Sequence, residues 1–364
     1  MRSIYTGFTL YGGADTFFAG ANTGRGFCGV YEEIADETKR ERVYIIKGAS
    51  GTGKSTFMRK IAEEAEKAGY PVTRYLCGSD PTSLDAVVLD ERIVVLDGTA
   101  PHSRDMAYPG AASALVDLSR FWKTDLLREN REEIIDCTAR KKAAFASGTR
   151  YLAAAETAEA EGHECAVRIL DADKLARFCA RTVPKKSAGE TGVAHDCRTH
   201  GIGMRGRAAA SGFAHVAARR IGIADVLGTG TILLARLGDA YLRHGVDVYR
   251  GLHPVGDRIT SLYIPSLGIL YTLATDGAAD GGVDKTIHMT RFLQKEPTGD
   301  DRGTAKLSMR IASGLVDEAA CAFQKAGEAH FRLEEIYRGA MDFRALERYA
   351  KTVRAEIAGY LTAK

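Results

Sequence analysis

Residues 48–55 read GASGTGKS and fit the pattern G-x-x-x-x-G-K-[ST] without a mismatch. The apolar run VYII at 43–46 precedes them and predicts a buried strand. After them, apolar side chains recur at helical spacing, at Phe57, Ile61, Ala65 and Ala68. A chance turn rich in glycine, serine and threonine is the alternative, but it does not explain the order strand, loop, helix. The sequence therefore predicts a loop that binds the phosphates of a nucleoside triphosphate.

Each residue type in this loop suits anion binding. Glycines let successive backbone N–H groups turn toward one anion, and the start of the following helix adds its positive end. Lys54 supplies a positive charge, and Ser55 offers a hydroxyl ligand to Mg²⁺. We predict that ATP and Mg²⁺ bind here. The predicted nucleotide-binding residues are Gly48, Ala49, Ser50, Gly51, Thr52, Gly53, Lys54, Ser55 and Thr56.

Residues 92–97, RIVVLD, predict a strand that ends in an acid. Ligands of a parallel sheet lie beyond the carboxyl ends of its strands, so Asp97 is expected to hold Mg²⁺ through water. Gly98 follows Asp97, in place of the glutamate with which many motor ATPases polarise water. The sequence therefore predicts slow or partner-triggered hydrolysis.

Two further residues are candidate catalytic groups. Asp80 follows the strand predicted at 72–76, where an acid can accept a proton from a hydroxyl substrate or order the attacking water. The alternative is that Asp80 caps a turn or a short helix. His102 lies in the loop beyond the third strand, although a lone loop histidine is commonly a surface hydrogen-bonding group. Arg104, two residues later, is a candidate charge clamp.

Residues 222–248 repeat the order of elements found at 43–72: apolar strand, Gly-Thr-Gly, amphipathic helix, glycine and a run ending in valine. Apolar spacing also predicts a helical hairpin after each copy, at about 125–183 with its turn at Gly162, and at about 312–363. We therefore predict an α/β fold of tandem P-loop NTPase-type three-layer parallel sheets. Each sheet is followed by a helical hairpin that packs the two halves together.

The second copy has lost the charged groups of the first. Its Gly-Thr-Gly, at 228–230, lacks the lysine, which we interpret as a deletion. Asp225 stands at the place of Gly48, where a carboxylate would repel phosphate. Thr272 is placed opposite Asp97. The second half is therefore predicted to be a degenerate relative of the first.

A polar, glycine-containing stretch at 185–192 predicts the boundary between a nucleotide-binding domain at 1–190 and a degenerate domain at 191–364. A motif with glycines and an arginine at 18–27 returns at 200–207, where it is expected to form part of each core near the nucleotide. The stretch from 197 to 224 contains no acidic residue but has five arginines, at positions 198, 205, 207, 219 and 220. A nucleic-acid patch and an exposed connector with solvated charges are the two interpretations, and the second is favoured.

Charge composition alone names no partner for this chain. Fifty basic against 47 acidic side chains leave a formal charge of +3, so no global field favours nucleic acid or a membrane surface. No run reaches the ~18 apolar residues that a membrane span needs, and no signal peptide is predicted. The seven cysteines are scattered without C-x-x-C spacing, which is typical of reduced thiols in a cytoplasmic protein.

Four blocks of the chain resemble a little-characterised family of bacterial double-P-loop ATPase-like proteins. The matching blocks are FFAGANTGRGF at 17–27, YIIKGASGTGKST at 44–56, LCGSDPTSLDAVVL at 76–89 and VVLDGTAPH at 94–102. The resemblance covers nearly the whole chain. It implies a tandem P-loop NTPase fold and ATP binding through residues 48–56 and Asp97, without a settled substrate.

Three functions remain open at this stage. The first is an ATPase whose candidate catalytic residues are Lys54, Asp97, Asp80 and His102, with the degenerate half as a partner or regulatory domain. The second is a small-molecule or nucleotide kinase that uses Asp80 as its base. The third is a non-catalytic nucleotide-dependent switch that binds an unknown protein partner through its helical hairpins.

Overall fold

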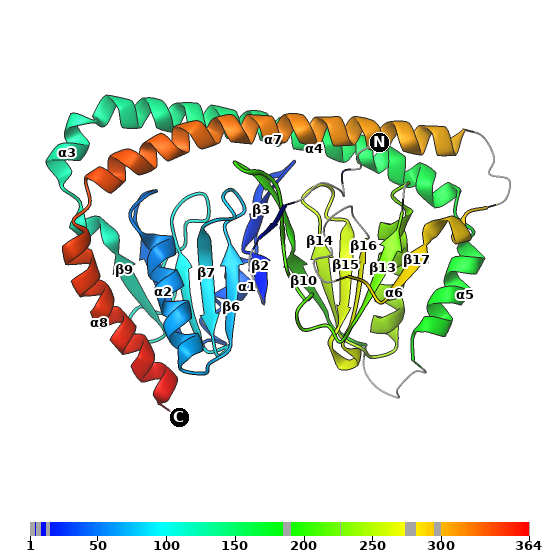
Figure 1. Cartoon of the computed structure of the whole chain (residues 1–364), viewed down its shortest axis with the longest axis horizontal. Coiled ribbons are helices and arrows are strands. Elements are labelled where there is room, and N and C mark those ends of the chain that lie inside the picture. Colours follow the sequence, from blue (N-terminus) through cyan, green and yellow to red (C-terminus); the bar gives the residue numbers. More distant parts are fainter. Residues whose placement is uncertain are drawn as a thin grey trace.

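The computed structural model describes residues 4, 9–11, 15–184, 191–225, 227–273, 282–294 and 300–363. Within these ranges the chain is an α/β protein built on a large mixed, mostly parallel sheet with helices around it (Figure 1). The sheet contains twelve of the described strands, in the order β17-β13-β16-β15-β14-β10-β2-β6-β7-β8-β5-β9. We call the residues up to 184 the first half and those from 191 the second half.

Each half contributes six neighbouring strands. The first half supplies β2 (Thr16–Phe18), β6 (Val72–Leu76), β7 (Leu84–Leu89), β8 (Ile93–Asp97), β5 (Arg42–Lys47) and β9 (Ser113–Asp117). The second half supplies β10 (Ala194–Arg198), β14 (Val248–Leu252), β15 (Ile259–Ile264), β16 (Ile269–Leu273), β13 (Arg219–Ala224) and β17 (Lys285–His288). The predicted strands at 43–46, 72–76 and 92–97 are confirmed.

The two halves share one strand order. In each, the first pair of strands is parallel, the next two pairs are antiparallel and the last two are parallel. Even the irregularity is shared, because the register shifts between Tyr75 and Leu76 in one half and between Gly251 and Leu252 in the other. A single antiparallel bridge between Phe18 and Arg198 joins the halves into one sheet.

This arrangement corrects the prediction of two separate parallel sheets. The segment after Asp80 is a turn followed by β7, not a short helix, and β7 runs antiparallel to both of its neighbours. The reason is the short connection at residues 90–92, because only an antiparallel hairpin can be closed by so few residues. The chain reverses direction once before β7 and once after it. The carboxyl ends of β6, β8 and β5 therefore still share one edge of the sheet.

Short helices flank the strands. They are α1 (Tyr31–Ile34), α2 (Lys54–Lys67), α3 (Thr124–Glu129) and α6 (Thr229–Arg243), with the 3₁₀ turns η1 (Leu118–Phe121), η2 (Pro265–Leu267) and η3 (Met289–Phe292). Two small sheets complete the fold. One pairs β3 (Gly20–Thr23) with β4 (Gly26–Gly29), and the other contains β1 (Thr9–Tyr11), β12 (Gly206–Ala210) and β11 (His200–Gly203).

Two long helices, α4 (Arg131–Arg168) and α7 (Asp301–Gly339), pack along each other above one edge of both halves (Figure 1). We call them the roof helices. The predicted turn at Gly162 is wrong, because α4 continues through this residue to Arg168. Gly162 is a packing position, where an added Cβ would lie 3.0 Å from the Cβ of Ser308 on α7. A glycine within a helix costs only about 1 kcal/mol, which close approach of the two helices offsets.

The helices that follow the roof helices are exchanged between the halves. The residue after η1, Trp122, forms a bridge with Met341, which lies between α7 and α8 (Phe343–Thr362). In mirror fashion Leu293, after η3, forms a bridge with Leu170, between α4 and α5 (Ala172–Thr182). As a result α8 packs on α2 of the first half, and α5 packs on α6 of the second (Figure 1).

The hydrophobic core follows this exchange. The apolar stripe of α8 is buried in one cluster with Phe57 and Ile61 of α2, and the stripe consists of Leu346, Ala350, Val353, Ile357 and Leu361. Likewise Leu175 of α5 is buried with Leu234 and Leu237 of α6. Each fully buried leucine or isoleucine contributes about 1.5–3 kcal/mol. The apolar stripes pack as predicted, but the predicted helical hairpins are wrong, because α5 and α8 pack on α6 and α2 and not back on α4 and α7. Residues 185–190 of the predicted linker at 185–192 lie outside the described residues.

Candidate functional site

The glycine loop at 48–53 lies between the carboxyl end of β5 and the first turn of α2, as the sequence predicts. Gly51 and Gly53 have φ angles of 75° and 95°, which side chains on L-residues disfavour. Gly48 is required for a different reason, because a Cβ there would lie 2.8 Å from Oγ1 of Thr52. The hydroxyl of Thr52 donates to the carbonyl of Ala49 at 2.8 Å, which closes the loop on itself.

Lys54 and Asp97 lie next to each other at the edge of the sheet. β5 and β8 are neighbouring parallel strands, and Ile46 pairs with Asp97 in their register. Nζ of Lys54 is 3.4 Å from Oδ2 of Asp97 and donates to the carbonyls of Gly48 and Ala49 at 2.9 and 2.8 Å. Oδ1 of Asp97 accepts from the N–H and the hydroxyl of Thr99 at 2.9 and 2.6 Å.

The hydroxyl of Ser55 is held by protein donors. It accepts from the backbone N–H of Leu84 and from Arg59, both at 3.0 Å, and Arg59 also donates to the carbonyl of Thr82 at 2.7 Å. These two bonds use both lone pairs of the hydroxyl oxygen. Ser55 can therefore become a metal ligand only after Arg59 releases it, whereas Asp97 fits a hard divalent cation as it stands.

Asp80 ends the turn after β6 and is bound on two sides. Its Oδ1 accepts from the N–H and hydroxyl of Thr82 at 3.0 and 2.7 Å, so the capping role considered from the sequence is present. Arg205 of the second half binds the same carboxylate through two bonds, of 2.7 and 3.2 Å. Burial raises the pKa of Asp80, but the bonds from Arg205 and Thr82 outweigh it and lower that pKa overall. An ionised, doubly bound carboxylate is a poor general base.

His102 is not a surface residue, because its side chain is only 8% exposed. Its ring stacks on Tyr31 with centroids 4.4 Å apart, and its Nε2 is 3.6 Å from Oδ2 of Asp85. The hydroxyl of Tyr31 donates to the same oxygen at 2.7 Å. Burial raises the pKa of Asp85, and His102 opposes this shift. Arg104 points elsewhere, since it pairs with Glu32, so it is no free charge clamp.

The two acids and the histidine offer a second set of metal ligands. Within the described residues, Asp85, Asp97 and His102 each present one ligand atom, and the three atoms lie within 4.8 Å of one another. Two carboxylates and an imidazole suit a divalent cation. This set includes Asp97 but not Ser55, so it differs from the predicted pair of ligands.

The roof helices cover the glycine loop. A Cβ added at Gly51 would lie 2.8 Å from the Cα of Glu334 on α7, so the two backbones are in direct contact. Lys141 of α4 faces the same place, and burial followed by repulsion from Lys54 lowers its pKa. Two buried or half-buried lysines at a loop that presents N–H groups favour an anion between them.

The loop of the second half is filled by a side chain of its own. Oδ1 of Asp225 accepts from the N–H of Leu227 at 3.0 Å and from the hydroxyl of Thr229 at 2.7 Å, and Oδ2 accepts from the N–H of Gly230 at 2.8 Å. The carboxylate thus takes the donors at the start of α6 that would otherwise face an anion. Asp225 therefore binds the donors of its own loop, in addition to the charge repulsion predicted from the sequence.

Helix caps correct the predicted alignment of the two loops. Gly53 and Gly228 are the left-handed residues directly before α2 and α6, so Thr229 matches Lys54. The lysine is replaced rather than deleted, and the loop before it is two residues shorter. The register also shifts the place of the acid by one residue. Ile223 pairs with Leu273 as Ile46 pairs with Asp97, so Leu273, not Thr272, stands opposite the acid.

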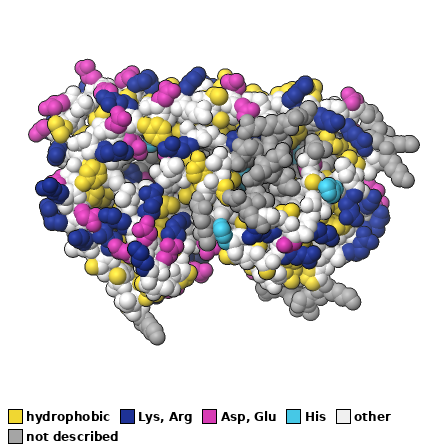
Figure 2. Space-filling model, in the orientation of Figure 1, with side chains coloured by type: hydrophobic (Ala, Val, Ile, Leu, Met, Phe, Trp, Pro, Cys, Tyr) yellow, Lys and Arg dark blue, Asp and Glu magenta, His cyan; other side chains and the backbone are white. Residues whose placement is uncertain are grey.

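The arginine stretch of the second half is largely neutralised by ion pairs. Arg198 pairs with Asp257 at 2.6 Å, Arg205 with Asp80 and Arg207 with Asp317 at 2.8 Å. Figure 2 shows Asp and Glu among Lys and Arg on the left, over the first half, and mainly Lys and Arg at the right edge, over the second. The favoured prediction of an exposed connector with solvated charges is wrong for Arg198 and Arg207, because both side chains are buried and paired.

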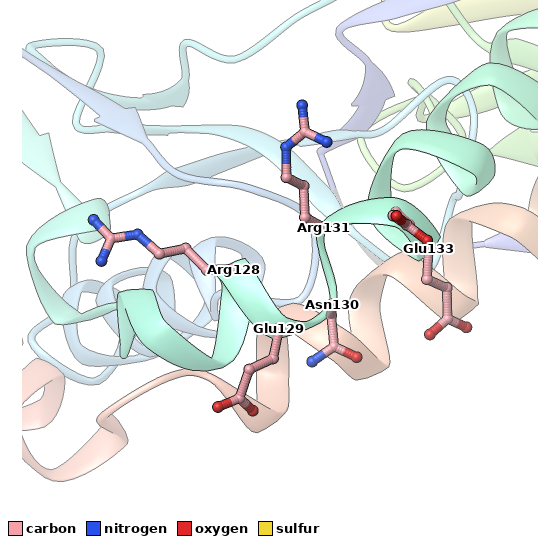
Figure 3. Close-up of a pocket in the computed structure, with 6 residues that line it drawn as sticks. Arg128, Glu129, Asn130, Arg131 and Glu133 are labelled. Atoms are coloured by element: carbon pink, nitrogen blue, oxygen red, sulfur yellow. The ribbon is translucent and has the colours of Figure 1, made fainter.

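Two cavities lie away from the glycine loop. One of about 480 Å³ at the junction of α3 and α4 is lined by residues 128–133, whose labelled side chains splay apart instead of converging (Figure 3). The other, of about 200 Å³, lies against the filled loop of the second half and is lined by Asp225, Thr229 and His288 among others. Neither brings together the groups of the glycine loop.

Sequence reasoning missed Tyr31, Asp85, Lys141, Arg205 and Glu334. Only two left a signal, since Asp85 lies inside the block at 76–89 and Arg205 lies in the repeated motif.

No helix in the described part of the chain has the length and apolar content to cross a bilayer. All seven cysteines are free thiols. Comparison with known protein families, with curated proteins and with solved structures found no match for the chain.

Proposed function

We propose that the first half binds Mg-ATP at the glycine loop and hydrolyses it slowly, with the second half as a non-catalytic partner domain. One observation carries this proposal. The glycine loop joins β5 to α2, and its Lys54 lies 3.4 Å from Asp97 at the end of the neighbouring strand. A nest of N–H groups, a lysine and a strand-end carboxylate are the groups that hold a triphosphate and its cation. The tandem P-loop NTPase fold and the family resemblance belong to the same proposal.

The residues divide the work by charge. The N–H groups of 48–53 and the start of α2 would bind the phosphates, and Lys54 would leave the carbonyls of the loop to neutralise them. Asp97 would hold Mg²⁺, whose positive charge would neutralise the negative charge of the phosphates. Lys141 would add a positive charge from the roof.

Slow turnover follows from the surroundings of the candidate bases. Asp80 is bound by Arg205 and Thr82, and His102 is packed against Tyr31 and Asp85. Gly98 follows Asp97, so no carboxylate comes directly after the strand. Without a free base beside the phosphates, water is activated poorly. The same geometry weakens the kinase alternative, which needs Asp80 as a base.

A matched pair of variants tests the proposal. Lys54→Ala should weaken saturable ATP binding at least about tenfold, because a charged hydrogen bond contributes about 1.5–3 kcal/mol. Thr229→Ala changes the matching residue of the second half and should leave ATP affinity within about twofold, since Asp225 fills that loop. Titration calorimetry with Mg-ATP measures both. If the wild-type protein does not bind ATP, or if Lys54→Ala binds it equally well, the proposal fails.

A nucleotide-dependent switch is a second candidate, because the backbone of Glu334 lies directly on Gly51. A terminal phosphate in the loop would then move α7, and with it α8. Hydrogen exchange in α7 and α8 should differ between ADP and a non-hydrolysable ATP analogue. Identical exchange with the two nucleotides would exclude this role.

A further inference from the structure

Two arginines cross between the halves in a reciprocal way. Arg25, in the turn between β3 and β4, pairs with Asp257 of the second half. Arg205, in the turn between β11 and β12, pairs with Asp80 of the first half. Both acids follow the equivalent strands β14 and β6, and both arginines precede a glycine with positive φ, at 26 and 206. Each half therefore supplies one arginine that forms an ion pair with an acid of the other half.

Only Arg205 is linked through its partner acid to a glycine loop that no carboxylate of its own fills. Arg205 binds Asp80, whose turn continues through Thr82 and Leu84 onto the hydroxyl of Ser55. Its guanidinium lies over Phe331 of α7, the helix whose Glu334 backbone covers Gly51. In the other half, Asp225 fills the loop, so Arg25 has no comparable anion to meet.

The surroundings of Arg205 allow it to change partner. Its side chain is 40% exposed, whereas that of Asp80 is 8% exposed. Its guanidinium lies 5.0 Å from the ring centre of Phe331 on α7, and this platform orients it independently of Asp80. Asp80 would keep two hydrogen bonds from Thr82 if the arginine left. Neither group would then be stranded without a partner.

Asp257 differs from Asp80 in that it binds two arginines. Its carboxylate binds Arg198 of the second half at 2.6 Å and also Arg25 of the first half, so three residues form one cluster. Burial raises the pKa of Asp257, but Arg198 and Arg25 lower it overall. In the first half, the position equivalent to Arg198 is Phe18, which cannot form an ion pair. Asp80 therefore has Arg205 as its ion partner without a second arginine in the described contacts.

We infer that Arg205 is a phosphate-contacting residue of the first half's nucleotide site, supplied by the second half and held at the mouth of the site by Asp80. This inference rests on the proposed function. A terminal phosphate carries more charge than a carboxylate and accepts the same two parallel N–H bonds. It therefore competes with Asp80 for the guanidinium, and Arg205 distinguishes ATP from ADP. No bond is made or broken in this exchange of partners.

The test compares the ratio of ATP to ADP affinity among matched variants. Arg205→Ala should reduce that ratio about tenfold, as expected for loss of a charged hydrogen bond. Arg205→Lys should retain part of it, because lysine keeps the charge but loses the fork. Asp80→Asn should raise the ratio, since it weakens the competitor. Arg25→Ala is the control, because it removes the equivalent arginine, which the first half supplies to Asp257 of the half whose loop is filled.

The outcomes separate the inference from the proposed function. If the wild-type protein binds no ATP, both fail. If it binds ATP and Arg205→Ala discriminates ATP from ADP as well as Arg25→Ala does, the inference fails and the proposed function stands. Circular dichroism with thermal unfolding checks that each variant is folded. If Arg205→Ala does not fold, Asp80→Asn decides the matter, because an unchanged ratio in that variant also overturns the inference.

Discussion

The two halves of the molecule have the same strand order but treat the start of their helices in opposite ways. Before α2, six residues form a loop with two left-handed glycines, and Lys54 folds onto the loop's carbonyls. Before α6, four residues bring Asp225 onto the N–H groups, and Thr229 replaces the lysine. The comparison teaches that two loops at the same place in the strand order can satisfy their backbone differently. In the second half a carboxylate of the loop itself accepts from the N–H groups at the start of the helix.

The largest effect is expected from alanine at the two glycines that share a φ angle of 75°. Gly51→Ala should lower the free energy of unfolding by about 3 kcal/mol, because left-handed strain adds to a clash with Glu334. Gly228→Ala should lower it by about 1 kcal/mol, because its nearest neighbour is the sulfur of Met309 at an ordinary 3.5 Å. Denaturant unfolding measures both values. Equal losses would mean that the contact with α7 does not constrain the loop.

Removal of Asp225 is expected to have the next largest effect. Asp225→Ala leaves two N–H groups and the hydroxyl of Thr229 without their acceptor, which should lower the free energy of unfolding by about 2 kcal/mol. Asp239→Ala removes the same charge from an exposed position of α6 and should change it by less than about 0.5 kcal/mol. Denaturant unfolding at low salt compares the two. If the two variants are equally stable, the carboxylate is not the group that satisfies this loop.

The two halves should also differ in how much stability they lose at low pH. Burial lowers the pKa of His200 in the second half to about 4, and the structurally equivalent first-half position is Gly20. A histidine whose pKa is lower in the folded than in the unfolded protein binds a proton more tightly when unfolded. Stability is therefore lost as the pH falls from about 6.5 toward 4, by about 1–2 kcal/mol at pH 5. His200→Asn should flatten the pH dependence of unfolding. The same slope in both proteins would assign the acid sensitivity to other groups.

The smallest effect is expected at the N-caps of α5 and α8, which are similar in the two halves. Asp171 caps α5 by accepting from the N–H of Lys174 at 2.9 Å, and Asp342 caps α8 by accepting from that of Ala345 at the same distance. Replacement of either acid by alanine should cost about 1 kcal/mol. Thermal unfolding of the two single variants should therefore give similar losses. A much larger loss for one would show that its helix contributes more to the shared core.

Local features of the fold and site were predictable from the sequence. The strand, glycine loop and helix at 43–67 follow from apolar spacing and a fixed motif, and Asp97 follows from its place at a strand end. Strand β7 was not predicted, because its six residues, LDAVVL, are too short a run to separate a strand from a helix by periodicity. The Gly162 turn was mistaken because a glycine that permits helix contact resembles a glycine that ends a helix.

Long-range features could not be read from one sequence. The pairs that bring Arg205 to Asp80 and Glu334 to Gly51 join residues more than a hundred positions apart, and no local pattern records them. The alignment of the two loops failed for a related reason. Matching the letters Gly-Thr-Gly placed Gly230 opposite Gly53, whereas the backbone shows Gly230 within α6. The Gly-Thr-Gly sequences are identical, but they do not occupy equivalent positions, because the loop before α6 is two residues shorter than the loop before α2.

The exchange of α5 and α8 decides whether one half of the chain could be deleted. Each half reaches a complete core only with a helix that the other half provides, so the two halves behave as partners in an obligate dimer encoded in a single gene. Deletion of the second half would strip α8 from α2 and expose its buried stripe. The first half therefore needs the second for the packing of its core, independently of any chemistry at the two loops.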